Sequence, residues 1–419
     1  MLRNDERTDA TPRRVRRVLI LADESANWRV AGLRQLDRLT LSLREFSQTV
    51  GEELTVCVLW SPDTAPERQW LSSESRITGC YIENGASSSD QEDEGFDLIL
   101  STRLFLYRNS IPQLIEAMPP LPDASVAPAQ SWYRYEATFV NALSAAPGKE
   151  GAQAWRYLRE IRDAPACERA FLRNSGKSQD GLVSRHVNRP FSRMISRLLL
   201  KLPIVPNTWS LLIFALPLWA CLEFLSGTGR GFFVGCVIYQ LYSILDGCDG
   251  EIARARFLQT DFGRRLDSLL DLVGNMLLAL SLGIGLARQW DRAHASGWFY
   301  VAEGLIAAMF IALSEGIVFA RRSRAASPAP AGKWNGALYQ RHHEFLERSG
   351  ILVLGERFAW WLVQLTKRDM AMLAFLALAA VGFAAGILHL LVAVSGVSAF
   401  LAGNAFLRQP APALSQEAS

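Results

Sequence analysis

Hydrophobic residues are distributed differently in the two halves of this chain. Beyond residue 207, long apolar runs occupy residues 209–225, 232–245, 266–286, 298–320 and 370–407. A helix needs about 20 apolar residues to cross roughly 30 Å of hydrocarbon, so each of the first four runs predicts one membrane span. The last run is long enough for two spans, and we divide it near residues 385–388. The pattern therefore predicts an α-helical integral membrane domain with six transmembrane helices.

The first half alternates between strand-like and helix-like segments. Residues 18–22, 54–60, 77–82 and 97–101 are short, apolar and in part β-branched, as strands are. Between the first two strands, apolar side chains recur from residue 33 to residue 46 at helical spacing. Such alternation predicts a soluble α/β domain with a parallel, Rossmann-like sheet.

These patterns divide the chain into four parts. We expect a basic N-terminal tail over residues 1–14, the α/β domain over 15–175, the membrane domain over 176–408 and a C-terminal tail over 409–419. Residues 183–202 interleave basic and apolar side chains just before the first span. This mixture predicts an interfacial helix in the membrane surface, with its cations directed toward anionic headgroups.

Composition and charge narrow the function classes. Among 419 residues, 44 basic and 41 acidic side chains leave a net charge of +3, which does not favour nucleic acid as a partner. Six scattered cysteines form no C-x-x-C pair, so neither a disulfide scaffold nor a zinc site is indicated. Arginine and lysine gather in residues 321–368, which predicts that this segment, the active site and both termini lie on the cytoplasmic side of the cell membrane.

Acidic side chains are concentrated where the second span ends and the third begins. Asp246 and Asp249 share one face of a helix, and Asp267 and Asp271 share a face of the next. Four ionised carboxylates near a membrane boundary need compensation. Two divalent cations would cancel four charges, and magnesium or manganese prefers carboxylate oxygens. A set of solvated helix ends paired with nearby arginines is the alternative, which the position between two apolar spans disfavours.

The spacing of these residues is also a recognisable motif. The pattern D-x-x-D-G-x-x-A-R-x8-G-x-x-x-D-x-x-x-D, from residue 246 to residue 271, resembles the signature of the CDP-alcohol phosphotransferase (phosphatidyltransferase) family at every fixed position. The Pro206-Asn207-Thr208 element and Ser210 are similar to a second element of that family. The resemblance covers residues 181–407. It implies transfer of a phosphoalcohol group from a CDP-alcohol donor to an alcohol or phosphoalcohol acceptor, with release of CMP.

The resemblance also implies roles for individual residues. Asp246, Asp249, Asp267 and Asp271 would hold two Mg²⁺ or Mn²⁺ ions, and Asp271 would serve as the catalytic general base. The residues that would bind the CDP group are Asn207, Thr208, Asp249, Gly250, Ala253, Arg254 and Gly263. The acceptor candidates are the four cations Arg321, Arg322, Arg189 and Arg193, which serve equally well as ordinary membrane anchors. Family members are commonly dimers, so the resemblance implies a homodimer in the lipid bilayer.

One branch of the family is closest in layout. The segments 246–254, 177–181 and 188–192 resemble the di-myo-inositol-phosphate-phosphate synthases, in which a nucleotidyltransferase domain precedes the membrane domain. Here the loop after the first predicted strand contains no glycine and carries Asp23 and Glu24, which would repel a triphosphate. We therefore expect residues 15–175 to be nucleotidyltransferase-like and non-catalytic.

Two other function classes compete with the enzyme. A catalytically silent membrane scaffold would use the α/β domain to recruit partners, but it has little need for the full set of four aspartates. An ion or substrate transporter would use the aspartates as a cation site, but all four lie near one membrane boundary rather than along a path across it.

Overall fold

The computed structural model describes ten segments of the chain. They are residues 14–69, 76, 81–84, 96–107, 110–117, 128–145, 155–174, 183–292, 296–324 and 368–407. Two compact units emerge, one made of Met1–Asn174 with Ala255–Phe257 and the other of Ser175–Arg254 with Leu258–Ser419. The predicted C-terminal tail, residues 409–419, falls outside the described residues, and so do the predicted N-terminal tail apart from Arg14 and most of the basic segment 321–368.

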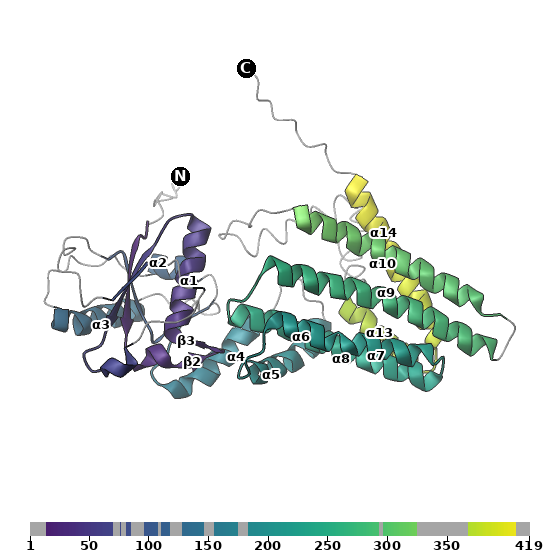
Figure 1. Ribbon diagram of the computed structural model, residues 1–419, viewed down its shortest axis with the longest axis horizontal. Coiled ribbons are helices and arrows are strands. Elements are labelled where there is room, and N and C mark those ends of the chain that lie inside the picture. Colours follow the sequence, from purple (N-terminus) through teal and green to yellow (C-terminus); the bar gives the residue numbers. More distant parts are fainter. Residues whose placement is uncertain are drawn as a thin grey trace, which may run out of the picture. The chain divides into compact units, whose positions relative to one another are not determined.

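A parallel sheet forms the centre of the first unit, which confirms the predicted α/β region. Its strands are β1 (Arg17–Ala22), β4 (Thr55–Trp60), β5 (Tyr81–Asn84) and β6 (Leu98–Ser101), in the order β5-β4-β1-β6. Figure 1 shows α1 (Gln35–Val50) and α3 (Pro128–Ala145) on opposite sides of the strands. Because helices cover both faces, the central strand β1 is buried from Val18 to Ala22.

The remaining elements of this unit are short. They comprise η1 (Glu24–Asn27), β2 (Arg29–Val30), β3 (Leu33–Arg34), η2 (Pro66–Arg68), β7 (Leu104–Leu106), α2 (Ile111–Ala117), β8 (Trp155–Tyr157), η4 (Ile161–Asp163) and α4 (Ala164–Asn174). The predicted helix begins at Gln35 rather than at Leu33, because Leu33 and Arg34 pair with β2 in an antiparallel ribbon. Strand β5 is described over Tyr81–Asn84, so it extends beyond the predicted end at residue 82, and residues 77–80 lie outside the described part of the chain.

A buried arginine lies in the first turn of α1. Arg38 is fully buried and donates hydrogen bonds to the carbonyls of Val30 at 2.7 Å and Ala255 at 3.1 Å. Its guanidinium also lies 5.0 Å from the ring centroid of Phe105. Burial lowers the pKa of Arg38 to about 10, because desolvation penalises its charged form. Carbonyl and aromatic contacts therefore compensate a charge that the surrounding core would otherwise exclude.

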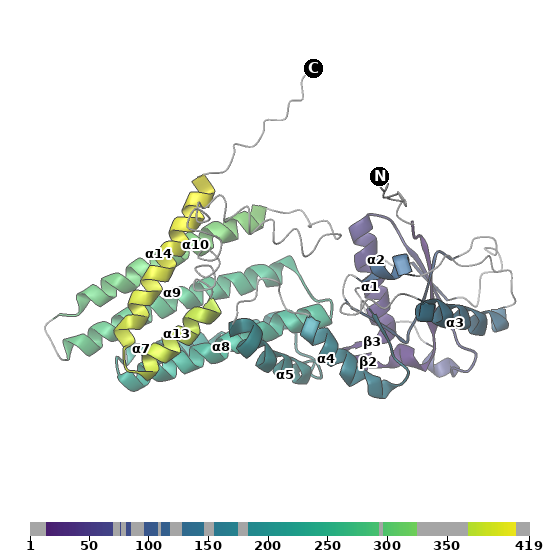
Figure 2. The same cartoon turned by 180° about the vertical axis from the view of Figure 1, so that it is seen from behind.

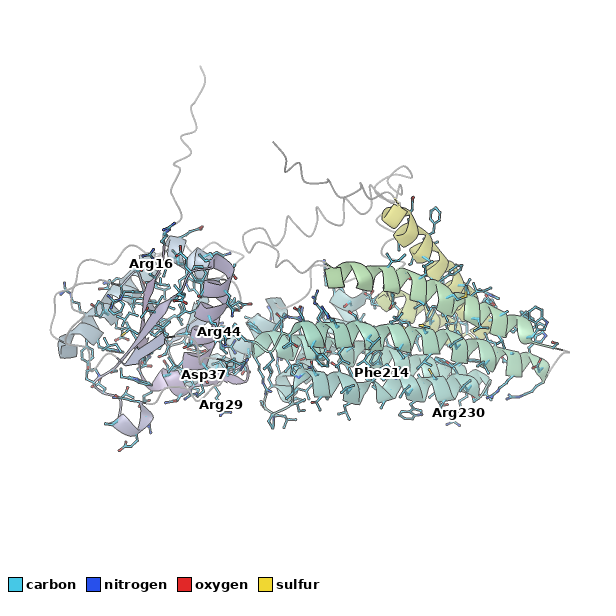
Figure 3. All side chains as sticks on the ribbon, turned by 45° about the horizontal axis from the view of Figure 1, so that its top comes forward. Arg16, Arg29, Asp37, Arg44, Phe214 and Arg230 are labelled. Atoms are coloured by element: carbon cyan, nitrogen blue, oxygen red, sulfur yellow. The ribbon has the colours of Figure 1, made fainter. Side chains whose placement is uncertain are left out.

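The second unit is a bundle of apolar helices. Its main members are α6 (Pro206–Ile213), α7 (Ala215–Leu225), α8 (Gly229–Ala255), α9 (Asp261–Asp291), α10 (Trp298–Arg324), α13 (Arg368–Ala380) and α14 (Ala384–Leu407). A local break at Phe214, labelled in Figure 3, separates α6 from α7 within one apolar segment. Alternating long helices and short connections place α8, α9 and α10 side by side (Figures 1 and 2).

Five of these helical segments are long and apolar enough to cross a membrane. They are Pro206–Leu225, Gly229–Ala255, Asp261–Asp291, Trp298–Ile317 and Ala384–Asn404. The remaining described segment, Asp369–Ala380, is a shorter apolar helix, so the sixth span stays a prediction. The last apolar run divides at residues 381–383, earlier than the predicted 385–388. Gly382 allows the break there because it adopts a φ of +78°, which side-chain-bearing residues rarely do.

The predicted interfacial segment is helical, and one of its cations is buried. A π-helical turn, η5 (Ser184–Asn188), leads into α5 (Arg189–Leu199). Phe191, Met194 and Leu198 are exposed on α5, whereas Arg189 is buried at 6% exposure. An exposed apolar stripe fits a helix with its apolar side toward lipid. The buried Arg189 differs from the expectation that every cation of this segment faces headgroups.

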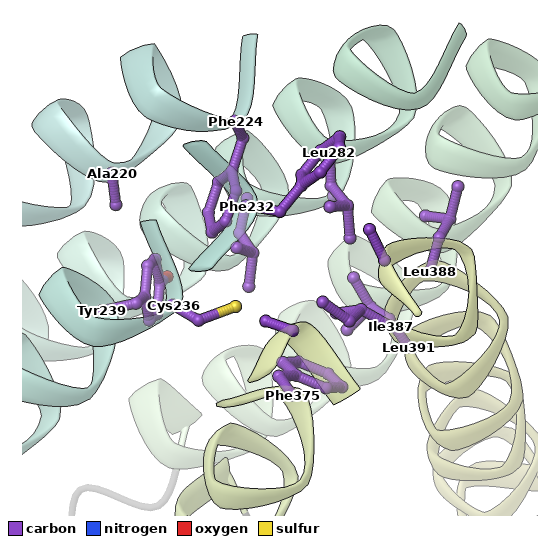
Figure 4. Close-up of a cluster of buried hydrophobic side chains, with 14 of the residues drawn as sticks. Ala220, Phe224, Phe232, Cys236, Tyr239, Leu282, Phe375, Ile387, Leu388 and Leu391 are labelled. Carbon is purple, nitrogen blue, oxygen red and sulfur yellow. The ribbon is translucent and has the colours of Figure 1, made fainter. Parts of the chain in front are cut away.

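Aromatic and aliphatic side chains from several helices form the core of the bundle. Figure 4 shows Phe224 of α7 and Phe232 of α8 packed near Leu282 of α9, with Phe375 and Leu388 contributed by α13 and α14. Figure 2 shows α13 and α14 in yellow along the same bundle. This core stabilises the middle of the bundle. Polar groups are found toward the ends of α8, α9 and α10.

Close approach of α9 and α10 depends on small residues. A Cβ added at Gly283 of α9 would lie 2.6 Å from the carbonyl oxygen of Tyr300 and 3.1 Å from the Cα of Gly304. Because both neighbours are backbone atoms, neither can rotate away. Membrane helices commonly use such small residues to bring their backbones together.

We predict that Gly283→Ala destabilises the helical unit. The added methyl forces α9 and α10 apart, and overpacking of this kind costs about 1–3 kcal/mol. Thermal unfolding of the purified protein in detergent measures the loss. Gly403→Ala is the matched control, because a Cβ at Gly403 of α14 meets nothing within 4 Å. Equal melting temperatures for the two variants would contradict the prediction.

Candidate functional site

Three of the four motif aspartates converge where α8 and α9 meet. Asp246 of α8 and Asp267 and Asp271 of α9 each offer one carboxylate oxygen, and these oxygens all lie within 4.8 Å of one another. All three residues are half-buried. Asp267 and Asp271 are one turn apart on α9, so the helix itself directs both toward α8.

Asp249, the fourth motif aspartate, lies outside this trio. One of its oxygens accepts a hydrogen bond from Ser210 Oγ at 2.5 Å, and the other accepts from the backbone amide of Gly250. Ser210 belongs to α6, so the contact connects the start of the first apolar segment to the motif helix α8. The structure therefore groups the four aspartates as three plus one.

Gly263 lies where a side chain would not fit. A Cβ at Gly263, in the first turn of α9, would lie 2.7 Å from Oδ1 of Asn207 in α6. Thr260 caps the same turn, because its hydroxyl accepts a hydrogen bond from the Gly263 amide at 3.0 Å. Gly263 thus allows the Pro206-Asn207 element to approach the start of α9. Thr208, one residue further, is exposed.

The other predicted nucleotide-binding residues line the last two turns of α8. Gly250 lies beside Arg254, since a Cβ at Gly250 would be 3.1 Å from Nη1 of that arginine. Ala253 is buried at 9% exposure. These residues share the α8 face that carries Asp246 and Asp249, as their spacing requires.

The four acceptor candidates lie on two helices, α5 and α10. Nη1 of Arg189 donates to Oε1 of Glu251 at 3.0 Å, and Glu251 is fully buried. Arg193 is half-buried on α5. Arg321 and Arg322 lie in the last turns of α10, and their side chains fall outside what the structure describes. The engaged Arg189 therefore serves the packing of α5 on α8, and its predicted role in acceptor binding stays untested.

Sequence reasoning did not anticipate four polar residues around the trio. Tyr242 Oη of α8 donates to Oδ1 of Asp271 at 3.2 Å, and Tyr239 Oη donates to Oδ1 of Asn275 at 3.2 Å. Asn275 Nδ2 donates to Oε1 of Glu315 in α10 at 3.0 Å. Spacing is the sequence signal that could have found Asn275, because this polar residue follows Asp271 by one helical turn within an apolar run.

The donor set of the trio fits a hard divalent cation. Three carboxylate oxygens within 4.8 Å of one another offer only oxygen ligands, which magnesium and manganese prefer over nitrogen or sulfur. One divalent cation offsets two of the three like charges. The geometry supports a cation at the trio.

At the end of β1 in the α/β unit, unlike in the trio, the acidic side chain is paired with donors of the fold itself. This position lies between β1 and β6, where open parallel sheets commonly bind ligands. Here Asp23 fills it, since its carboxylate accepts hydrogen bonds from the Ser25 amide at 2.8 Å and from Arg103 Nε at 2.6 Å. Ser25 and Thr102 hydroxyls share a further hydrogen bond of 2.7 Å. The groups that would bind a phosphate thus already bind a carboxylate of the chain itself.

Comparison with known proteins finds a family model and relatives that match part of the chain. Residues 203–398 match the family model described as CDP-alcohol phosphatidyltransferase. The chain is 33% identical over 152 residues to a protein of Rubrobacter xylanophilus named "Bifunctional IPC transferase and DIPP synthase", which covers 36% of this chain and 34% of the relative. A protein of the same name from Thermococcus kodakarensis is 32% identical over 160 residues, or 38% of this chain and 34% of the relative. The matches thus span about a third of these relatives' length.

We predict that Mn²⁺ stabilises the purified protein through the trio. A cation at 100 times its dissociation constant raises the free energy of unfolding by about 2.7 kcal/mol, which thermal unfolding with and without Mn²⁺ detects. Asp267→Asn should remove most of this rise, because it replaces a charged ligand by a neutral amide. Asp261→Asn is the control, since Asp261 is exposed in the first turn of α9 and pairs with Arg264. An undiminished Mn²⁺ response in Asp267→Asn would exclude this site.

Proposed function

We propose that residues 203–398, which belong to the CDP-alcohol phosphatidyltransferase family, catalyse transfer of a phosphoalcohol group from a CDP-linked donor to an alcohol, with release of CMP. The convergence of Asp246, Asp267 and Asp271 within the family motif is the observation that carries this proposal. We further propose that the reaction serves phospholipid or polar-headgroup biosynthesis. The enzyme then lies in the cell membrane with six spans, both termini and the active site cytoplasmic, as a homodimer.

The proposed reaction is an in-line displacement at phosphorus. The acceptor hydroxyl oxygen forms a bond to the phosphorus that carries the donor alcohol, and the bond from that phosphorus to the CMP oxygen breaks. The electron pair of the broken bond leaves with CMP. Two divalent ions, Mg²⁺ or Mn²⁺, supply charge neutralisation for the pyrophosphate when bound at the aspartates.

Each polar residue of the site has a definable part in this scheme. Asp271 is the proposed general base, which takes the proton of the attacking hydroxyl. The hydroxyl of Tyr242 donates to Asp271 and so fixes which oxygen of that carboxylate faces the substrate. Ser210 similarly fixes the orientation of Asp249. Arg254, beside Gly250, is placed to balance donor phosphate charge on the same helix face.

The α/β unit is proposed to be non-catalytic. Asp23 bonds to Arg103 and to its own loop at the position where a nucleotide phosphate would bind. A second anion there meets electrostatic repulsion and finds the local N–H donor already occupied. The CDP-alcohol is therefore supplied by a separate cytidylyltransferase reaction.

We predict CMP release from a panel of CDP-alcohols that depends on the motif aspartates. Purified protein is incubated with CDP-diacylglycerol or CDP-inositol, alcohol acceptors and Mg²⁺ or Mn²⁺, and CMP is followed by chromatography. Asp271→Asn should lower kcat by about 10²–10⁴-fold, the usual contribution of general base catalysis. Asp261→Asn should retain wild-type turnover. Full turnover in Asp246→Asn or Asp267→Asn would refute the enzyme proposal, and a catalytically silent scaffold would show no CMP release in any variant.

We also predict that the purified chain does not make a CDP-alcohol from CTP. Incubation with CTP, Mg²⁺ and inositol phosphate or glycerol phosphate should release no pyrophosphate above a protein-free blank. The physical reason is the internal Asp23–Arg103 pair in the α/β unit. Pyrophosphate release that Arg103→Ala abolishes would show instead that this unit is an active nucleotidyltransferase.

A further inference from the structure

The end of α8 and the two residues after it belong to the α/β unit. The segment Ala255–Phe257 is grouped with Met1–Asn174 rather than with the helices that precede and follow it. It lies between Asp249, the last motif aspartate of α8, and Asp261, the first residue of α9. We call Ala255–Phe257 the linker segment. A stretch of chain between the two helices that carry the trio is thus part of the α/β unit.

Three successive carbonyls of the linker segment accept hydrogen bonds from arginines that are distant in sequence. Arg38 Nη2 donates to the carbonyl of Ala255 at 3.1 Å. Arg76 Nη1 donates to the carbonyls of Arg256 at 2.7 Å and Phe257 at 2.9 Å. Because Ala255 ends α8, its carbonyl has no partner within the helix, and the helix dipole favours a cation there. The two arginines therefore cap the helix that carries Asp246 and Asp249.

Phe257 adds an apolar contact and an unfavourable backbone conformation. Its side chain packs against Leu33 and Leu41, and its ring centroid lies 5.9 Å from the guanidinium carbon of Arg38. The φ of Phe257 is +55°, in the left-handed region that bulky side chains rarely adopt. Such a conformation persists only where the surrounding contacts stabilise it. The contacts of the linker segment with the α/β unit thus offset the cost of this turn.

Arg38 is a costly residue for a protein core. It is fully buried, and within the described part of the chain its Nε and Nη1 have no hydrogen-bond partner. An aliphatic side chain would fill the same space without the cost of burying a charge. Packing of α1 therefore does not require an arginine, whereas the carbonyls of Val30 and Ala255 require a donor.

The linker segment is connected to the trio by short lengths of chain. Asp246 lies nine residues before Ala255 on α8, a rise of about 14 Å over which a helix bends little. A fixed helix end therefore restrains the position of Asp246. Repulsion among the three carboxylates favours separation of α8 from α9 when no cation is bound. A linker segment held in place opposes that separation.

We propose that the α/β unit acts as a positioning domain for the trio, in which Arg38 and Arg76 hold the linker segment and so keep Asp246 close to Asp267 and Asp271 before a cation binds. The effect on turnover rests on the proposed function, whereas the effect on cation binding does not. Arg38 and Arg76 are positioning residues, because they act through the end of α8. The inference gives a role to a unit that is proposed to make no CDP-alcohol.

Direct Mn²⁺ binding to the purified chain in detergent tests the proposal. Free Mn²⁺ is measured by electron paramagnetic resonance, and Asp267→Asn identifies the binding that belongs to the trio. Arg76→Ala should raise the Kd of this site about 10-fold, the factor for losing one hydrogen bond to a charged group. Arg76→Lys keeps a cationic donor and should raise the Kd less. Arg68→Ala is the matched control, because Arg68 is an exposed arginine of the same unit that pairs with Glu24.

Turnover provides a second measurement that separates positioning from general damage. At limiting Mn²⁺, Arg76→Ala should release CMP from a CDP-alcohol more slowly than wild type. Saturating Mn²⁺ should restore the rate, because the bound cation then offsets the repulsion that the linker segment opposed. The KM for the CDP-alcohol at saturating Mn²⁺ should stay unchanged. A lower rate that saturating Mn²⁺ does not restore, together with an unchanged Kd for Mn²⁺, overturns the inference.

Phe257→Ala tests the linker segment without changing an arginine. It removes the ring from Leu33 and Leu41 and should also raise the Kd for Mn²⁺. Circular dichroism establishes that each variant is folded, and Phe257→Ala decides the question where Arg76→Ala does not fold. The same Kd in wild type and in the folded linker variants overturns the inference.

Failure of the inference is distinguishable from failure of the proposed function. A Kd for Mn²⁺ that rises in Arg76→Ala, with no CMP release from any CDP-alcohol, refutes the proposed function and supports the positioning role. CMP release with a wild-type Kd in both Arg76→Ala and Phe257→Ala refutes the positioning role alone. An absence of Mn²⁺ binding in wild type overturns the positioning role as well.

Discussion

Repulsion among three carboxylates is the constraint on which the helical unit depends. The oxygens of Asp246, Asp267 and Asp271 lie within 4.8 Å of one another. Two unit charges at that separation repel by about 3 kcal/mol at an effective dielectric constant of 20. Helices α8 and α9 must therefore be held together by other contacts before the charges can be brought this close. Apolar packing of α8 side chains such as Phe232 and Cys236 with α9 side chains such as Leu278 and Leu282 in one core supplies those contacts. A divalent cation bound there would offset this repulsion.

Helix α8 has two faces with different roles, one that carries site residues and one that packs against neighbouring helices. One face carries Tyr239, Tyr242, Asp246 and Asp249 toward the site. The other face packs against α5, where Asn188 accepts from Gln240 at 2.9 Å and Arg189 and Ser192 both donate to Glu251. Burying Glu251 and Arg189 together is costly unless the geometry is good, and removing either partner leaves an uncompensated charge. This second face fixes the rotation of α8, and the rotation decides where the aspartates point.

The motif residues were predictable because their spacing is short-range, whereas their partners were not. Helical periodicity alone places Asp267 and Asp271 on one face, and the structure brings both to Asp246. Periodicity cannot say which residue of another helix faces Asp249, and Ser210 lies 39 positions away along the chain. Arg189 illustrates the opposite error. Its charge predicted exposure to headgroups, but a buried glutamate 62 positions away determines its environment. The positions of the strands and their parallel arrangement were predictable, while the break at Gly382 depends on a backbone angle that composition does not reveal.

Asp23 and the trio show how environment gives the same side chain opposite consequences. In the α/β unit, Asp23 has an arginine at 2.6 Å and a backbone amide at 2.8 Å, so its charge is compensated by the fold. In the helical unit, the same side-chain type is brought next to two others of equal charge. When groups of the fold already pair with a carboxylate, that carboxylate has a structural role, because a ligand would gain little by binding it. Where like charges converge, a bound cation would lower the electrostatic energy of the carboxylates, so such a cluster favours cation binding. The helical unit thus brings like charges together in an acidic cluster, whereas the carboxylate at the end of β1 is paired with groups of its own unit.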